Sequence, residues 1–174
     1  MPKDKPPVFT LGHSTRKLSE FISIIKKYKI EEIADVRTIP RSRKNPQFNE
    51  MHLFKFLKKH GIKYEHMKGL GGLRRPNKDS PNLYWRNASF RGFADYMQAK
   101  AFSDSLSALI KAAKKRNVAI MCAEAVPWRC HRSLIADALL VKGIKVMHIF
   151  STTNIREHTM TKSAKVSKGK VTYP

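Results

Sequence analysis

Short apolar runs and longer segments of helical periodicity alternate along this chain of 174 residues. The apolar runs predict five strands, at residues 8–11, 32–37, 62–66, 118–122 and 145–149. Apolar residues spaced by three or four positions predict five helices, at residues 18–25, 49–61, 90–100, 103–115 and 130–142. Strands that alternate with helices are typical of a parallel sheet with helices on both of its faces.

We therefore expect a single α/β domain of three layers, with an open, mostly parallel, five-stranded sheet flanked by helices. The fourth apolar run, residues 118–122, has apolar residues on both sides and suits the centre of the sheet. The favoured strand order is 3-2-1-4-5, which places the first and fourth strands side by side, whereas the order 2-1-3-4-5 would separate them. Residues 8–150 form this domain, residues 1–7 are an N-terminal extension, and the polar, basic residues 151–174 are expected to be an exposed tail.

Polar side chains follow the first, second and fourth predicted strands. They are His13, Ser14 and Arg16 after the first strand, Asp35, Arg37 and Arg41 at or after the second, and Cys122, Glu124, Cys130, His131 and Arg132 at or after the fourth. Because the carboxyl ends of parallel strands face one edge of the sheet, these residues are expected to share one rim, where open α/β domains bind ligands. The pattern predicts a functional site at that rim.

Four motifs occur in a fixed order along the chain. They are TLGHSTR at residues 10–16, DVR at 35–37 with PRSR at 40–43, LGG at 70–72, and CAE at 122–124 followed by CHR at 130–132. This ordered set resembles the domain-of-unknown-function family 488, and the resemblance extends from about residue 9 to residue 149. It implies an α/β domain with a shared polar site, and it implies no particular reaction.

Cys130 is the candidate nucleophile of the rim. It precedes a predicted helix and has arginines nearby, and both a helix dipole and neighbouring cations lower the pKa of a thiol. His13 is the expected base, because adjacent residues such as Cys130 and His131 point roughly 100° apart on a helix. The alternative is that Cys130 is a small buried apolar side chain, which is the expected role of Cys122.

Glu124 and Asp35 are the candidate general acids or bases, since each follows or ends a buried strand. The alternative is that both carboxylates only hold the loops together through ion pairs. Those pairs would be Asp35 with Arg37 or Arg16, and Glu124 with Arg132.

An anion is the expected ligand, because arginine forks bind phosphate and carboxylate in bidentate fashion and a helix N-terminus adds to the attraction. The expected anion-binding residues are Ser14, Arg16, Arg37, Arg41, Arg43, His131 and Arg132. Solvated loop arginines are the alternative. Soft metal ligands are present in Cys122, Cys130, His131 and His13, but Cys-x7-Cys-His is not a usual zinc spacing, so we expect no metal and no cofactor.

The charge of the chain points to polyanionic partners. Its 35 Lys and Arg residues against 13 Asp and Glu give a net charge of +22, which favours contact with nucleic acid. The loop at residues 68–87 interleaves cations with aromatic residues, a pattern that suits stacking of unpaired bases, although it also suits a plain lid packed on the sheet. The candidate nucleic-acid-binding residues there are Arg74, Arg75, Tyr84, Trp85 and Arg86.

No apolar stretch is long enough for a signal peptide or a membrane span, so we expect a cytoplasmic protein with reduced thiols and no membrane partner. Two hypotheses follow for its function. The first is an enzyme that acts on a nucleic acid or a phosphorylated, nucleotide-like substrate at the rim. The second is a nucleic-acid-binding module without chemistry, in which the same polar residues are structural. Turnover would distinguish the two.

Overall fold

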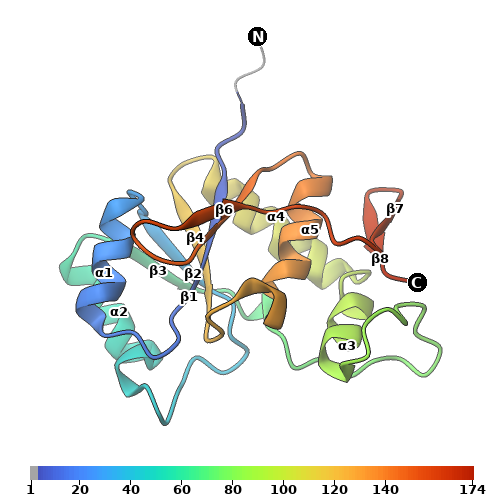
Figure 1. Ribbon diagram of the computed structural model, residues 1–174, viewed down its shortest axis with the longest axis horizontal. Coiled ribbons are helices and arrows are strands. Elements are labelled where there is room, and N and C mark those ends of the chain that lie inside the picture. Colours follow the sequence, from blue (N-terminus) through green and yellow to red (C-terminus); the bar gives the residue numbers. More distant parts are fainter. Residues whose placement is uncertain (1–3) are drawn as a thin grey trace.

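A six-stranded sheet forms the middle of the molecule, with helices packed on both of its faces (Figure 1). The computed structural model describes residues 4–174. The strands are β1 (Val8–Gly12), β2 (Glu32–Asp35), β3 (Lys63–His66), β4 (Val118–Cys122), β5 (Val146–Ile149) and β6 (Ile155–Glu157). Strands β1 to β5 are parallel, and β6 pairs antiparallel with β5. The predicted α/β class is confirmed, with one strand more than expected.

The strand order is β3-β2-β4-β1-β5-β6. The predicted order 3-2-1-4-5 is wrong in one respect, because β4 lies between β2 and β1 instead of beyond β1. The predicted pairing of the first and fourth strands is confirmed, from Phe9 opposite Ala119 to Gly12 opposite Cys122. Residues 118–121 are fully buried, which explains why this strand takes the centre of a sheet that helices cover on both faces.

The helices divide between the two faces of the sheet (Figure 1). Helices α1 (Leu18–Lys27) and α2 (Glu50–Lys59) cover one face, α4 (Lys100–Ala113) and α5 (Arg132–Val141) cover the other, and α3 (Ala88–Tyr96) packs beside the second pair. None of the helices within residues 4–174 is long and apolar enough to cross a bilayer.

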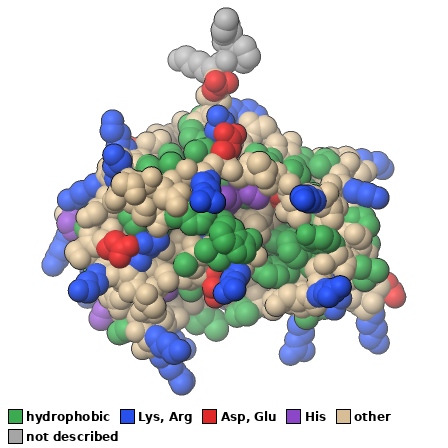
Figure 2. All heavy atoms as spheres, in the orientation of Figure 1, with side chains coloured by type: hydrophobic (Ala, Val, Ile, Leu, Met, Phe, Trp, Pro, Cys, Tyr) green, Lys and Arg blue, Asp and Glu red, His purple; other side chains and the backbone are tan. Residues whose placement is uncertain are grey.

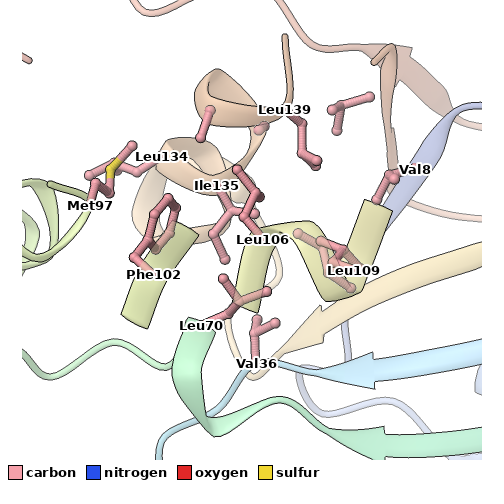
Figure 3. Packing of buried hydrophobic residues seen from close by; sticks show 14 of the residues in the cluster. Val8, Val36, Leu70, Met97, Phe102, Leu106, Leu109, Leu134, Ile135 and Leu139 are labelled. Atoms are coloured by element: carbon pink, nitrogen blue, oxygen red, sulfur yellow. The ribbon is translucent and has the colours of Figure 1, made fainter. Parts of the chain in front are cut away.

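Two apolar cores form because successive residues of a strand point to opposite faces. Ile33 and Met121 belong to the core under α1 and α2, whereas their neighbours Ala34 and Ile120 belong to the core under α4 and α5. Figure 3 shows the second core, where leucines of α4 lie between α5 and the sheet. The rigid sheet between these cores fixes the strand ends that carry the polar rim.

Residues 151–174 pack on the domain, contrary to the exposed tail expected from their composition. They contain β6 and a hairpin of β7 (Lys165–Ser167) and β8 (Lys170–Thr172). Val171 and Tyr173 are buried in the core under α4 and α5. The Tyr173 hydroxyl donates to Oδ2 of Asp137 at 2.8 Å, and its backbone N–H donates to Oδ1 of Asn82 at 2.8 Å. These two buried residues, together with the pairing of β6 with β5, anchor the segment to the domain.

Candidate functional site

The carboxyl ends of β1, β2 and β4 meet at one edge of the sheet, as their shared parallel pairing requires (Figure 1). The loop after β1 lies directly against the loop after β4, where the His13 N–H donates to the Cys122 carbonyl at 2.9 Å. Gly12 permits this approach, since a Cβ there would collide with the Glu124 carbonyl oxygen. A pocket of about 330 Å³ opens at this edge. Its polar and reactive lining includes Arg37, Arg41, Cys122, Glu124, Arg129, Cys130 and His131.

Cys130 forms part of the pocket wall and is only 3% exposed. Its sulfur accepts the backbone N–H of Arg132 at 3.5 Å and the Nε–H of the same residue at 3.4 Å, and it lies 3.7 Å from Nδ1 of His131. The prediction that Cys130 and His131 point apart is wrong, because Cys130 has extended backbone before α5 begins and is not in the helix. His13, the predicted base, makes its hydrogen bonds to Arg37 and Ser14 instead.

Cys130 and Cys122 differ in protonation. Burial alone would raise the pKa of the Cys130 thiol, but hydrogen bonds with Cys122 and His131 and the charge of Arg132 outweigh burial and hold that pKa well below its ordinary value. The hydrogen bond to Cys130, together with burial, raises the pKa of the Cys122 thiol well above its ordinary value. Cys130 is therefore the thiol of the pair that loses its proton more readily, and thiolates of this kind are reactive.

His131 is fixed by contacts around its ring. Its Nε2–H donates to the Val36 carbonyl at 3.0 Å, and the edge of the ring packs against Phe93 at a centroid distance of 5.0 Å. Gly72 lies against the ring, since a Cβ there would be 3.1 Å from Nδ1 of His131. Gly72 of the LGG motif thus has a packing role against His131.

A buried ion pair lies on the β2 side of the pocket. Arg37 donates from Nε to Oδ1 of Asp35 at 2.9 Å and from Nη2 to Oδ2 at 2.7 Å, and the Tyr64 hydroxyl donates to Oδ2 at 2.6 Å. Nη1 of Arg37 donates to Nε2 of His13 at 3.3 Å, and Nδ1–H of His13 donates to the Ser14 carbonyl at 2.9 Å. Burial lowers the pKa of His13 to about 4, so its ring is neutral at neutral pH. Asp35 and His13 therefore hold Arg37 in place. This arrangement matches the alternative in which Asp35 forms a structural ion pair and is not a general acid or base.

Arg132 does not form the predicted ion pair with Glu124. Its guanidinium is 1% exposed and donates to the sulfur of Cys130, to the hydroxyl of Thr10 at 3.2 Å, and to the main-chain carbonyl of Glu124. The Glu124 carboxylate instead belongs to an exposed residue in the pocket wall. Because Arg132 lies beneath the pocket and does not line it, its role is to stabilise the thiolate and not to contact a ligand.

Comparison with known families gives one match. The family model described as Domain of unknown function DUF488 matches residues 17–139, which is more than half of the chain. The chain belongs to the DUF488 family. No curated protein and no solved structure matches the chain. The family description names no activity.

Two arginines in the pocket wall of this DUF488 domain are exposed and form no ion pair within residues 4–174, namely Arg41 and Arg129. Arg43, on the same loop as Arg41, is also exposed but does not line the pocket. Arg16, another predicted anion ligand, forms an ion pair with Glu20 one helical turn later in the sequence. The cations available to a ligand are therefore fewer than the sequence predicts.

A chain of buried polar side chains that the sequence analysis does not predict extends from Arg132 across the sheet. The Thr10 hydroxyl accepts from Arg132 and donates to Nδ1 of His148 at 2.6 Å. Nε2–H of His148 donates to Nδ1 of His158 at 2.9 Å, and Nε2–H of His158 donates to Asp137 at 2.8 Å. Burial lowers the pKa of His148 to about 3, so this ring is neutral. In the sequence, the only sign of this network is that Thr10 and His148 are polar residues inside the apolar strands β1 and β5.

The predicted nucleic-acid-binding loop lies partly over a second cavity, of about 440 Å³. The aromatic and histidine residues of its lining are Tyr84, Trp85, Trp128, Phe150, His148 and His158. Arg75 and Arg86 are exposed, whereas the guanidinium of Arg74 stacks over the Tyr96 ring at 3.7 Å from the ring centroid. The loop thus combines exposed cations with packed ones.

Proposed function

We propose that the pocket beside Cys130 binds a phosphate-bearing ligand, a nucleic acid or a nucleotide-like molecule, and that the protein is an enzyme that acts on it. One observation carries the proposal: two arginines that the fold does not use, Arg41 and Arg129, line the same pocket as a stabilised thiolate. A guanidinium without an internal partner is free to bind phosphate oxygens as a fork.

The roles of the pocket residues follow from their surroundings. Cys130 supplies the reactive group, and the two N–H groups that Arg132 donates to its sulfur stabilise its negative charge. Glu124, exposed in the wall, is the proton donor or acceptor that a substrate in the pocket can reach. A thiolate of this kind needs reducing surroundings, which fits the cytoplasmic location expected from the sequence.

Charge outside the pocket favours a polynucleotide. The net charge of +22 creates a positive field that attracts polyanions. Figure 2 shows Lys and Arg side chains spread over the visible face, with hydrophobic side chains gathered nearer its centre. Cations distributed over a face in this way support contact with several phosphates of one nucleic-acid strand. The alternative, a binding module without chemistry, has the same charge but no use for a stabilised thiolate.

Binding to the pocket is tested with Arg41→Ala and Arg129→Ala, measured by calorimetry with inorganic phosphate and with a single-stranded oligonucleotide. Hydrogen bonds to charged groups contribute about 1.5–3 kcal/mol, so each variant should weaken phosphate binding roughly 10- to 100-fold. Arg43→Ala is the matched control, because it removes an equal charge from the same loop outside the pocket. Equal losses in all three variants would refute a specific pocket.

Salt and Cys130→Ser complete the test. Oligonucleotide affinity should fall steeply with salt concentration, since phosphate contacts release counterions. Cys130→Ser should keep that affinity and lose turnover if the protein is an enzyme. A binding module would show the same salt dependence and no thiol-dependent turnover with any nucleotide offered.

A further inference from the structure

Three soft donor atoms converge at one side of the pocket. The sulfurs of Cys122 and Cys130 and a ring nitrogen of His131 all lie within 4.8 Å of one another. Nδ1 is the nitrogen that faces Cys130, at 3.7 Å, because Nε2 is bonded to the Val36 carbonyl. In a tetrahedral zinc site, bond lengths of about 2.3 Å to sulfur and 2.0–2.1 Å to nitrogen place ligand atoms roughly 3.5–3.8 Å apart.

We propose that Cys122, Cys130 and His131 bind one zinc ion, with the fourth coordination position open to the pocket. In the zinc-bound protein Cys130 is a metal ligand, and the role of reactive thiolate given to it above belongs to the metal-free protein. Among the abundant divalent ions, zinc is the one that binds a donor set of two thiolates and an imidazole best. Three protein ligands with one open position are typical of zinc sites that take part in reactions. The spacing Cys-x7-Cys-His is unusual for zinc sites, but the fold brings the ligands together: Cys122 ends β4, and Cys130 and His131 lie in the segment just before α5.

The surroundings orient the ligands as known zinc sites require. A zinc-binding histidine usually donates its other ring N–H to a carbonyl or carboxylate, and here Nε2–H of His131 donates to Val36. The sulfur of Cys130 accepts two N–H groups of Arg132, which compensate part of its charge. These hydrogen bonds hold the sulfur of Cys130 and the ring of His131 in the orientation that a zinc ion requires.

Charge balance sets the fourth ligand. Zinc binding requires Cys122 to release its thiol proton to solvent, after which two thiolates neutralise the ion. Arg132 is buried beside them and leaves the cluster with a charge of about +1, since Arg37 is already neutralised by Asp35. An anion, either hydroxide or a phosphate oxygen, then suits the open position. The assignment of phosphate rests on the proposed function, but zinc binding itself does not.

Zinc binding is tested by titrating Zn²⁺ into the reduced, metal-free, full-length protein by calorimetry, and Co²⁺ by absorption spectroscopy. One equivalent should bind, with release of at least one proton. Altering residues around the ligands of a zinc site costs 10- to 100-fold in affinity, so loss of a ligand in Cys122→Ser, Cys130→Ser or His131→Asn should cost at least about 100-fold. Each serine variant should also lose about half of the sulfur-to-cobalt charge-transfer absorption.

His66→Asn is the matched control, because His66 also bonds a main-chain carbonyl at a strand end, that of Arg37, but lies outside the cysteine cluster. It should bind zinc as the unaltered protein does. If the ligand variants fail to fold, two measurements on the unaltered protein decide: zinc should raise its melting temperature and protect both cysteines from a thiol reagent.

Two results would overturn the site: zinc binding no tighter than that of the Cys122→Ser/Cys130→Ser double variant, or an unaltered protein that zinc neither stabilises nor protects. Either result leaves the phosphate measurements on Arg41→Ala and Arg129→Ala intact, because those are made on metal-free protein. Failure of the zinc site and failure of the phosphate pocket are therefore distinguishable.

Discussion

The C-terminal segment should contribute strongly to stability, and Tyr173→Ala tests this. Tyr173 is fully buried, packs against Trp85 at a centroid distance of 5.4 Å, and donates its hydroxyl to Asp137. Truncating a buried aromatic side chain to alanine costs about 3–5 kcal/mol. Tyr173→Phe keeps the ring and should cost about 1–3 kcal/mol, because the carboxylate of Asp137 then loses one of its donors.

The free energy of unfolding is measured by urea denaturation followed by circular dichroism. A chain of this size loses about 2–4 °C of melting temperature per kcal/mol, so in a thermal scan Tyr173→Ala should also lower the melting temperature by roughly 6–20 °C. Val166→Ala is the control, because Val166 lies in the hairpin that directly precedes Tyr173 but is 52% exposed, and surface changes usually stay within about 0.5 kcal/mol. Equal stabilities of Tyr173→Ala, Val166→Ala and the unaltered protein would show that the segment is not part of the folded core.

Two further predictions concern the buried polar groups. Arg132→Ala should lower the free energy of unfolding by about 3–5 kcal/mol, because it leaves a buried thiolate uncompensated. The same change should shift the pH dependence of Cys130 alkylation by iodoacetamide, measured by mass spectrometry, to higher pH. An unchanged pH profile would contradict the role given to Arg132. The neutral histidines His13 and His148 have folded-state pKa values of about 4 and about 3, below the ordinary value of 6.5. Below pH 6.5 the unfolded chain therefore binds more protons than the folded one, so stability is full above pH 6.5 and falls as the pH drops toward 4 and then 3. Urea midpoints between pH 8 and pH 5 should show this fall, less steeply in His148→Gln, and identical slopes in the two proteins would refute it.

Periodicity and composition determine much of this protein in advance. The sequence pattern predicts the five parallel strands, although not the short strands β6, β7 and β8. The wholly apolar run at residues 118–122 belongs at the centre of the sheet because neither of its faces favours contact with water. Parallel strands then force the residues after β1, β2 and β4 to one edge. For that reason the sequence alone locates the pocket and names Arg41, Glu124 and Cys130 as residues of its wall.

The tertiary structure decides which partner each side chain takes. Arg132 and Glu124 have opposite charges and nearby positions, yet the buried guanidinium of Arg132 bonds to the Cys130 sulfur, the Thr10 hydroxyl and the main-chain carbonyl of Glu124, and not to the Glu124 carboxylate. Likewise, Cys130 has an extended backbone before α5 begins, and this brings its sulfur near the ring of His131. The predicted helix from residue 130 would have pointed the two side chains apart.

The C-terminal segment shows the same division between sequence and structure. Its lysines determine that most of residues 151–174 stay in water. Val171 and Tyr173 are nevertheless buried, because β8 packs against α5 and Tyr173 bonds to Asp137, both of which come from a distant part of the chain. Local pattern therefore determines the elements and the edge at which polar residues gather, whereas pairing between side chains depends on distances that exist only after the chain has folded.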